Sequence, residues 1–198
     1  MTEPSKTLLM VGNPNVGKSA LFNRLTGGDA VVSNYPGTTV DYTKGLLVVS
    51  GREYGVIDAP GTYSLEARDA AESVTVRLIS ENPGAAVLVI LDATRVERGL
   101  YLALEVIERG RPAVIALNMI DAARDRRIVV DTHMLQKILG VPVVPTSAVT
   151  GEGVRDLAEM IRKAQKADIE KVRARADGRF NEPERSGGCA GCGLCGGC

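Results

Sequence analysis

The sequence predicts an α/β fold in which a mainly parallel six-stranded sheet carries helices on both faces and includes one antiparallel hairpin. Apolar runs typical of strands alternate along the chain with segments of helical periodicity. The run at residues 85–91 is continuously apolar, as expected for a parallel strand that is covered on both faces. Polar clusters follow the strands, and sheets of this kind bind ligands at the carboxyl ends of their strands.

The first strand and helix enclose a glycine-bounded loop. Residues 7–11 predict a buried strand, residues 20–25 predict a helix that ends at Gly27 and Gly28, and GNPNVGKS lies between them at 12–19. This order is the context of a phosphate-binding P-loop. Gly12 and Gly17 let the backbone wrap so that its amides point inward, and the helix N-terminus adds partial positive charge. Lys18 can then reach the β- and γ-phosphates of a nucleotide, and the Ser19 hydroxyl can bind Mg²⁺.

The same patterns predict the remaining elements. Residues 29–39 hold turn formers without a period and predict a loop, and 40–50 and 52–60 predict the two strands of the hairpin. Further strands are expected within 85–93, 112–121 and 141–148, and helices within 64–80, 100–107, 132–139 and 154–161.

Composition limits the classes of function. The 198 residues allow one well-cored domain plus a tail, and 24 basic residues balance 24 acidic ones. With no bulk charge, no tryptophan and 4% aromatics, we expect no nucleic-acid partner. No apolar run is long enough for a membrane span, and the first residues lack the apolar core of a signal peptide. We therefore expect a cytoplasmic protein.

Two loops are predicted to sense the γ-phosphate. Asp58 ends a strand expected beside the P-loop, where its carboxylate can hold a Mg²⁺-bound water, and Gly61 can offer its N–H to the γ-phosphate. A threonine from the loop before the hairpin can complete the Mg²⁺ shell. Thr38 and Thr39 are both candidates, of which we favour Thr39. The predicted Mg²⁺ ligands are thus Ser19, Thr39 and Asp58.

The base is selected by a later cluster. Asn118 and Asp121 follow a buried strand, and Ser147 and Ala148 end the next one. The Asp121 carboxylate matches the two donors of the guanine edge, whereas adenine would leave that carboxylate unpaired, and such sites reject the wrong ligand strongly. The Ala148 amide is expected to reach guanine O6. The sequence therefore predicts GTP rather than ATP.

The predicted site has three groups of residues. The predicted GTP contacts are Gly12, Asn13, Pro14, Asn15, Val16, Gly17, Lys18, Ser19 and Ala20 in the P-loop, Gly37, Thr38, Thr39, Asp58, Ala59, Pro60 and Gly61 in the switches, and Asn118, Met119, Asp121, Ser147, Ala148 and Val149 around the base.

The motifs GNPNVGKS, NYPGTT, DAPGTYSL, NMID and TSAVTGEG together resemble the N-terminal G domain of the bacterial ferrous iron transporter FeoB. The resemblance covers about residues 5–166 and implies a Ras-like P-loop NTPase fold and a GTPase switch serving iron uptake. It also implies a membrane iron permease or another Feo component as partner, and a possible peripheral place at the inner membrane. No permease is present in these 198 residues.

The resemblance further implies a K⁺ ion beside the phosphates. Asn15 resembles the asparagine that helps to bind K⁺ in cation-activated members, and residues 33–37 resemble the loop whose carbonyls complete that site. Ras-type proteins place a glutamine where this chain has Thr62, so the usual water-positioning amide is missing. A cation near the phosphates could supply charge as an arginine finger does. The residues expected to act in hydrolysis are Lys18, Thr39, Gly61 and Asn15.

We expect a G domain over 1–167, a charged flexible linker over 168–188 and a Cys/Gly-rich tail over 189–198. The tail places Cys189, Cys192, Cys195 and Cys198 at two-residue gaps, which suits Zn²⁺ or an iron–sulfur cluster. A redox dithiol and a tail with incidental cysteines are the alternatives. For the whole chain, the alternatives to a GTPase switch are a GTP-dependent binding module and a ribosome- or assembly-type GTPase.

Overall fold

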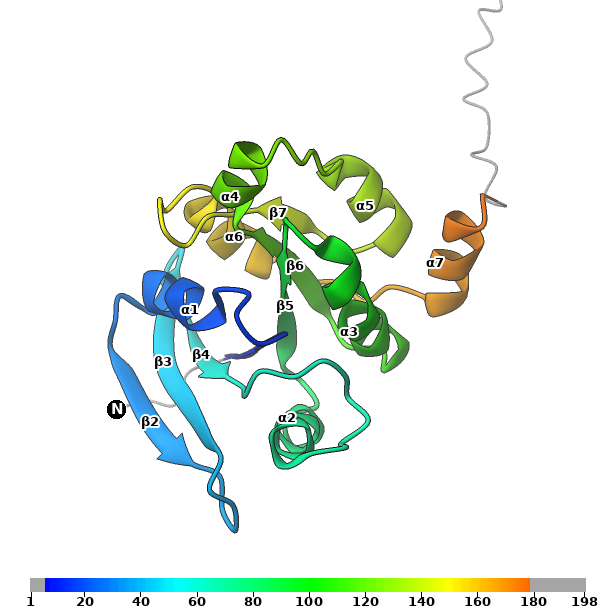
Figure 1. Cartoon of the computed structure of the whole chain (residues 1–198). Helices are drawn as coiled ribbons and strands as arrows, with labels where there is room; N and C mark the ends of the chain where they lie inside the picture. The colour runs from blue at the N-terminus through cyan, green and yellow to red at the C-terminus, as the bar shows by residue number, and fades with distance from the viewer. Residues whose placement is uncertain (1–5, 179–198) are drawn as a thin grey trace, which may run out of the picture.

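The computed structural model describes residues 6–178. Seven strands form one sheet in the order β2-β3-β4-β1-β5-β6-β7 (Figure 1). The strands are β1 (Lys6–Gly12), β2 (Ala30–Asn34), β3 (Asp41–Val49), β4 (Arg52–Asp58), β5 (Ala86–Asp92), β6 (Ala113–Asn118) and β7 (Val143–Pro145). The helices are α1 (Lys18–Thr26), α2 (Ala70–Glu81), α3 (Val96–Glu108), α4 (Ile120–Asp125), α5 (Thr132–Leu139), α6 (Val154–Ile161) and α7 (Ile169–Ala176).

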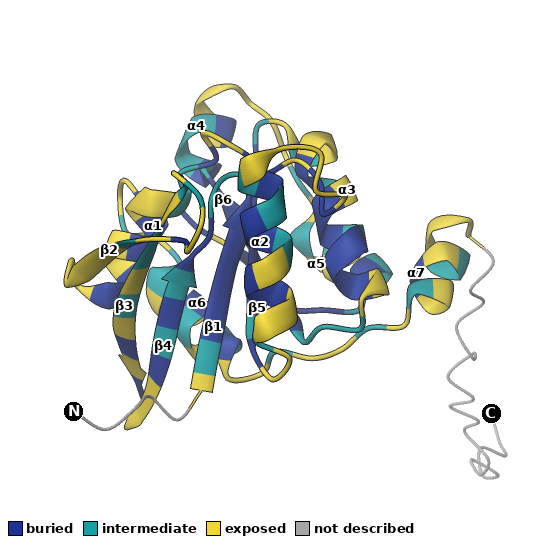
Figure 2. Ribbon diagram, turned by 90° about the horizontal axis from the view of Figure 1, so that it is seen from below, coloured by how far each residue is buried: buried dark blue, intermediate teal, exposed yellow. Residues whose placement is uncertain are grey.

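The predicted α/β class is confirmed. Strand β1 pairs in parallel with β4 and β5, and β5, β6 and β7 continue the parallel part, whereas β3 is antiparallel to β4 in the predicted hairpin. Each central strand sends alternate side chains to opposite faces. Leu9 and Val89 pack with α2 and α3, while Met10 and Ile90 pack with α1 and α6. Figure 2 shows the buried residues gathered on β1, β5 and β6.

The strand count of six was wrong, because residues 30–34 lie in the stretch predicted to be a loop and form β2. This strand pairs antiparallel with β3 at the edge of the sheet, from Ala30 opposite Gly45 to Asn34 opposite Asp41. Its side chains are mostly exposed, so the sequence carries no buried alternation there. The backbone pairing with β3 alone defines the strand.

Two helices also differ from expectation. Helix α2 begins at Ala70 rather than near Ser64, because Asp69 caps it by accepting from the Glu72 amide at 2.7 Å. Helix α7 lies in the stretch expected to be a flexible linker. Its N-cap Asp168 accepts from the Glu170 amide at 2.9 Å, and Val172 is buried in the same core as α5. Part of the predicted linker is therefore packed structure.

The topology brings the polar clusters together at the end of the sheet where the parallel strands have their carboxyl ends. Met10 of β1 lies opposite Asp58 of β4, Gly12 opposite Ile90 of β5, and Asp92 opposite Asn118 of β6. The carboxyl ends of β1, β4, β5, β6 and β7 therefore meet at the edge from which the P-loop departs (Figure 1). This edge carries the candidate site.

Candidate nucleotide-binding site

The P-loop closes between β1 and α1 in a conformation that needs its glycines. Gly17 has a φ of 80°, and a Cβ there would lie 2.4 Å from Nδ2 of Asn118. At Gly12 a Cβ would lie 2.9 Å from the carbonyl oxygen of Ile90. Asn15 is also left-handed, with a φ of 66°, which asparagine tolerates better than most residues. The loop borders a hollow of about 360 Å³ that Gly61 also lines.

Lys18 points from the start of α1 to the end of β4. Its Nζ lies 2.5 Å from Oδ1 of Asp58 and 2.5 Å from the carbonyl oxygen of Ala59. The Ser19 hydroxyl donates to Oδ2 of Asp58 at 3.3 Å. The side chains of Lys18 and Asp58 are only 11% and 7% exposed, so each charge is largely compensated by the other.

The same residues fit a magnesium ion. The Ser19 hydroxyl and the Asp58 carboxylate are hard oxygen donors, and they lie side by side at the mouth of the P-loop. Mg²⁺ usually binds through one or two protein oxygens together with substrate phosphates and water. A bound cation would also replace Lys18 as the positive neighbour of Asp58. The donor set therefore suits Mg²⁺ held jointly with a nucleotide.

The segment after Asp58 lies against the P-loop and is fastened to α3. A Cβ at Gly61 would lie 3.2 Å from Pro14, and the Thr62 amide donates to the Gly12 carbonyl at 3.0 Å. The buried Thr62 hydroxyl donates to the Ser64 carbonyl at 2.6 Å. The hydroxyl proton of Thr62 is therefore used within this segment.

Leu65 is held at both ends of its backbone. Its amide donates to the buried Glu105 carboxylate at 2.8 Å, and its carbonyl accepts from the Arg109 guanidinium at 2.7 Å. Glu105 of α3 and Arg109, the C-cap of that helix, form an ion pair at 3.7 Å. Because this clamp holds residues before α2 in an irregular conformation, the helix cannot begin where its periodicity first appears.

The two threonines in the loop between β2 and β3 have different surroundings. The Thr38 hydroxyl donates to the Tyr35 carbonyl at 3.1 Å and accepts from the Val40 amide at 3.3 Å. Thr39 is exposed. Tyr35 is buried, and its hydroxyl donates to Glu81 on α2, which raises the pKa of Tyr35. The occupied Thr38 hydroxyl supports the preference for Thr39 as the Mg²⁺ ligand, which stays a prediction.

Asn118 joins the phosphate end of the site to the base end. Its Nδ2 donates to the Val16 carbonyl at 2.9 Å, and its Oδ1 accepts from the Ala148 amide at 3.0 Å and the Thr146 hydroxyl at 3.3 Å. The Ala148 amide, expected at guanine O6, thus bonds Asn118 in this structure. Asp121 lies half-buried in the first turn of α4, where its carboxylate remains the predicted base-reading group.

Sequence reasoning missed two arginines that hold the loop after β7. Arg24 of α1 donates to the carbonyls of Ala148 at 3.0 Å and Val149 at 2.6 Å. Arg124 of α4 makes two hydrogen bonds of 2.7 Å to Glu152. Neither pairing leaves a local signal, because the partners are brought together only by the order of the strands.

The Arg124–Glu152 pair predicts a titration shift. Hydrogen bonding from Arg124 holds the pKa of Glu152 below its ordinary value, although nearby Asp121 opposes this. A lowered folded-state pKa means that the pair stabilises the loop above the ordinary glutamate pKa and that this stability is lost as the pH falls through the folded pKa. We expect Arg124→Gln to raise the Glu152 pKa, measured by carbon-13 NMR titration. Arg126→Gln, an exposed change on the same turn, should leave it unchanged; an equal shift in both variants would contradict the pairing.

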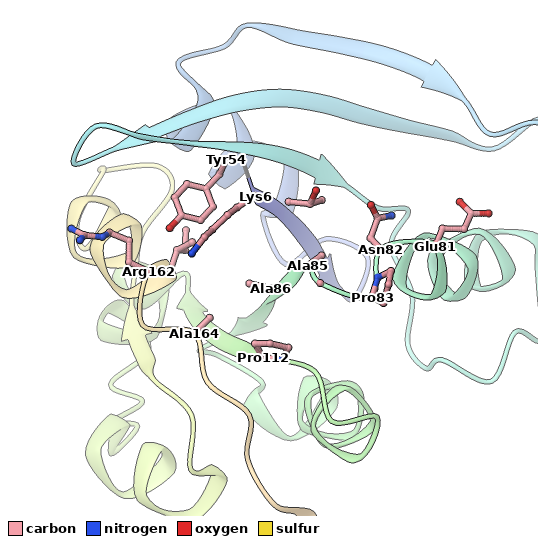
Figure 3. A pocket seen from close by; sticks show the side chains of 13 residues that line it. Lys6, Tyr54, Glu81, Asn82, Pro83, Ala85, Ala86, Pro112, Arg162 and Ala164 are labelled. Carbon is pink, nitrogen blue, oxygen red and sulfur yellow. The ribbon is translucent and has the colours of Figure 1, made fainter. Parts of the chain in front are cut away.

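A larger hollow of about 520 Å³ lies at the opposite edge of the sheet (Figure 3). Lys6, Tyr54 and Arg162 face it together with Ala86, the first residue of β5, and Pro112, which directly precedes β6. None of the polar clusters that the sequence singled out reaches it. Choosing the site by cavity volume would therefore select the wrong hollow. The polar clusters at the carboxyl ends of the strands identify the candidate site instead.

The cysteine tail and part of the predicted linker lie outside the described residues. Within residues 6–178 no group of three His, Cys, Asp or Glu side chains gathers as a metal site. None of the helices in that range is both long enough and apolar enough to cross a bilayer. Zn²⁺ or an iron–sulfur cluster at Cys189, Cys192, Cys195 and Cys198 stays a prediction.

A single side chain, Asn118, ties the P-loop to the loop that reads the base, so the phosphate and purine ends form one continuous site. The molecule is therefore a P-loop domain of the GTPase type, a GTP-binding G domain. Comparison with known proteins makes the assignment specific. The chain belongs to the family of ferrous iron transport protein B, whose N-terminal-domain model, FeoB_N, matches residues 6–161.

Individual relatives are consistent with this family assignment. The Fe(2+) transporter FeoB of Salmonella typhimurium strain LT2 is 36% identical over 155 residues, which make up 76% of this chain and 20% of that protein. A Porphyromonas gingivalis fusion of Fe(2+) transport protein A with Fe(2+) transporter FeoB is 39% identical over 153 residues, 77% of this chain and 18% of the relative. The chain thus spans about a fifth of the length of the curated relatives it matches.

Solved structures are similar over the same region. The G domain of the T. maritima FeoB iron transporter superposes with a TM-score of 0.75 at 38% identity, covering 80% of this chain and 98% of that one. The cytosolic domain of L. pneumophila FeoB gives 0.79 at 35% identity, covering 83% and 66%. The fold and the family assignment are therefore consistent.

Proposed function

We propose that this domain binds GTP with Mg²⁺, hydrolyses it to GDP and phosphate, and acts as a switch in ferrous iron uptake. The observation that carries the proposal is the arrangement of Lys18, Ser19 and Asp58 at the mouth of the P-loop. Lys18 would neutralise the β- and γ-phosphates once the nucleotide replaces Asp58 as its partner. Ser19 and Asp58 would hold Mg²⁺, which neutralises charge that develops on the transferred phosphoryl group.

The two switch loops would respond to the γ-phosphate through different contacts. Gly61 lies against Pro14 of the P-loop and lines the same hollow, where its N–H would donate to a terminal phosphate. Thr39 is exposed in the loop between β2 and β3 and would turn inward to complete the Mg²⁺ shell. Both contacts exist only with a triphosphate, so hydrolysis would release both loops.

Potassium would supply the charge that this chain lacks. Asn15 borders the phosphate hollow, and with residues 33–37 it would hold the ion. A cation there stabilises charge in the transition state, and Thr62 cannot substitute for it because its hydroxyl is bound to Ser64.

Potassium dependence gives a second prediction. We expect hydrolysis with K⁺ to exceed that with Na⁺ by about tenfold, below the ~10³–10⁵ of an arginine finger because a monovalent ion exchanges with solvent. The ratio should fall to about one in Asn15→Gly, which keeps the left-handed backbone and removes only the side chain. Equal initial rates of phosphate release in both salts would refute the K⁺ site.

Multiple-turnover phosphate release tests the enzyme itself. Steady release from GTP with Mg²⁺, and none from ATP, is expected of a GTPase switch. Release that stops after one equivalent would favour the alternative, a binding module that responds to GTP occupancy. The ribosome-assembly alternative finds no support among the relatives described above, which are named as iron transporters.

Iron transport belongs to the longer relatives, so the partner is also a proposal. We infer a cytoplasmic domain that works at the inner membrane with an iron permease or another Feo component. Support comes from the relatives' names and from solved structures described as cytosolic domains of FeoB. The expected division of G domain, linker and tail remains part of this proposal, with α7 packed against the body.

A further inference from the structure

The chain between β4 and α2 is irregular and passes beside α3 (Figure 1). It contains Gly61, which lines the phosphate hollow, and Leu65, whose side chain is buried in the same core as residues of α3. Only three residues separate the two, so a contact that fixes Leu65 also limits where Gly61 can lie. The contacts of Leu65 with α3 therefore bear on the nucleotide site.

Glu105 and Arg109 fix the backbone of Leu65 from both sides. The Leu65 amide has no helix or sheet partner, and it donates to the Glu105 carboxylate at 2.8 Å. The Leu65 carbonyl accepts from the Arg109 guanidinium at 2.7 Å. Hydrogen bonds to charged groups are stronger than neutral ones. Glu105 is only 7% exposed, so its carboxylate also needs these partners, because burying an unpaired charge is costly. These two residues form the Leu65 clamp.

The backbone just beyond the clamp is strained. Ala67 has a φ of 58°, a left-handed conformation that is unfavourable for alanine. Such conformations persist only where the surrounding contacts impose them. One such contact is the hydrogen bond of 3.1 Å from the Tyr101 hydroxyl on α3 to Glu66. Another is the hydrogen bond of 3.0 Å from the Arg68 amide to Glu72. The segment is therefore held in a conformation that its own sequence does not favour.

The residues between Gly61 and the clamp leave little slack. The Thr62 amide donates to the Gly12 carbonyl at 3.0 Å, and the Thr62 hydroxyl donates to the Ser64 carbonyl at 2.6 Å. A Cβ at Gly61 would lie 3.2 Å from Pro14, so this part of the segment lies directly against the P-loop. One end of the short connection is thus fixed to the P-loop and the other to α3.

We propose that Glu105 is a positioning residue for the nucleotide site. Together with Arg109 it holds Leu65, and through the short connection it keeps Gly61 beside the P-loop, where the Gly61 N–H meets the γ-phosphate. Neither Glu105 nor Arg109 lines the phosphate hollow, so both act at a distance. The inference rests on the proposed function, because it needs a triphosphate in that hollow. Its effect is selective, since GDP has no γ-phosphate to meet Gly61.

The role of Glu105 is tested by the ratio of two affinities of the full chain, for a non-hydrolysable GTP analogue and for GDP. Both are measured with Mg²⁺ by competition against a fluorescent nucleotide. We expect Glu105→Ala to lower the preference for the analogue by about tenfold, because a distant change that displaces a binding group by about 1 Å can cost up to about 10²-fold. The rate of phosphate release at saturating GTP should fall by about as much. Glu105→Gln keeps an acceptor for the Leu65 amide, so it should retain most of the preference.

Two arginine variants separate positioning from stability. Arg109→Gln removes the other half of the clamp at an exposed side chain, so it should fold and lower the preference in the same direction. Arg111→Gln is the matched control. Arg111 also ties the chain near α2, because it donates to the Pro83 carbonyl at 2.6 Å, but it does so beyond the C-terminus of that helix and away from Gly61. This control should lower the Tm and leave the preference unchanged.

The outcomes separate this inference from the proposed function. Unchanged preferences in both Glu105→Ala and Arg109→Gln would overturn the positioning role. An equal fall in Arg111→Gln would also overturn it, because a general loss of stability would then explain the effect. If Glu105→Ala does not fold, Arg109→Gln decides. A natural chain that binds no guanine nucleotide would contradict the proposed function together with this inference. A chain that binds both nucleotides but releases no phosphate would contradict hydrolysis alone, and the affinity ratio would still decide whether Glu105 positions Gly61.

Discussion

Replacing Asp121 with asparagine is expected to lower the affinity for GTP by about 10²–10⁴-fold and to create affinity for xanthosine triphosphate. Each charge-assisted hydrogen bond to a carboxylate contributes about 1.5–3 kcal/mol, and Asp121 is predicted to accept two from guanine. The asparagine amide would face the guanine donors with a donor of its own. Xanthine carries an oxygen in place of the guanine amino group, so it complements that amide.

The position of Asp121 makes this test specific. It lies in the first turn of α4, close enough to Arg124 and Glu152 to influence the pKa of both. Asp125→Asn removes the same charge from the end of the same helix, where the side chain is exposed. We expect that control to bind GTP normally in a fluorescent-nucleotide titration. If Asp121→Asn bound GTP as tightly as the natural chain, the assignment of the base-reading carboxylate would be wrong.

Gly17→Ala is expected to destabilise the nucleotide-free domain by about 4 kcal/mol. A left-handed alanine costs about 1–2 kcal/mol, and its Cβ would displace Nδ2 of Asn118, 2.4 Å away. Asn118 is buried and makes three hydrogen bonds, each contributing about 1 kcal/mol. A destabilisation of this size should lower the Tm by about 8–16 °C, which thermal unfolding followed by circular dichroism would measure.

Nucleotide binding should weaken along with stability. Loss of the Asn118 bonds would uncouple the P-loop from the base loop, and about 3 kcal/mol of lost preorganisation corresponds to about 10²-fold in affinity. Gly27→Ala is the matched control, because Gly27 has a φ of 72° but nothing within 4 Å of its Cβ position. That variant should lose about 1–2 kcal/mol and keep its affinity. Similar losses in both variants would show that backbone strain, and not Asn118, explains the effect.

Lys18 and Asp58 form a compensated pair at the mouth of the P-loop. Each of these two charges would be costly if left alone in so buried a place, and together they compensate one another. GTP with Mg²⁺ offers both residues a new partner of the opposite sign. Binding therefore exchanges one compensated arrangement for another, and this keeps the penalty for opening the site small.

Several features could be predicted from the sequence because they are encoded locally. The apolar run before GNPNVGKS and the helical pattern after it identify β1, the P-loop and α1 without reference to any distant residue. The continuous apolar runs identify β5 and β6 in the same way. Since parallel strands end at a common edge, the clusters at Asp58 and Asn118 could also be placed together.

Other features carry no local signal. Strand β2 exists because its backbone pairs with β3, although its side chains are mostly exposed. Helix α2 begins late because Glu105 and Arg109 hold Leu65 from another helix. Helix α7 looked like a linker because one buried residue, Val172, gives no periodicity.

By itself, the sequence determined the fold class, the phosphate-binding loop and the polar clusters that follow the strands, because the spacing of apolar and glycine residues specifies each locally. Only the tertiary structure decided what those residues touch. In the folded chain, Asn13 donates to the carbonyl of Arg98, 85 positions away, and Arg24 donates to the carbonyl of Ala148, 124 positions away. The order of strands in the sheet sets such long-range contacts, and that order depends on how all the layers pack together rather than on any one segment.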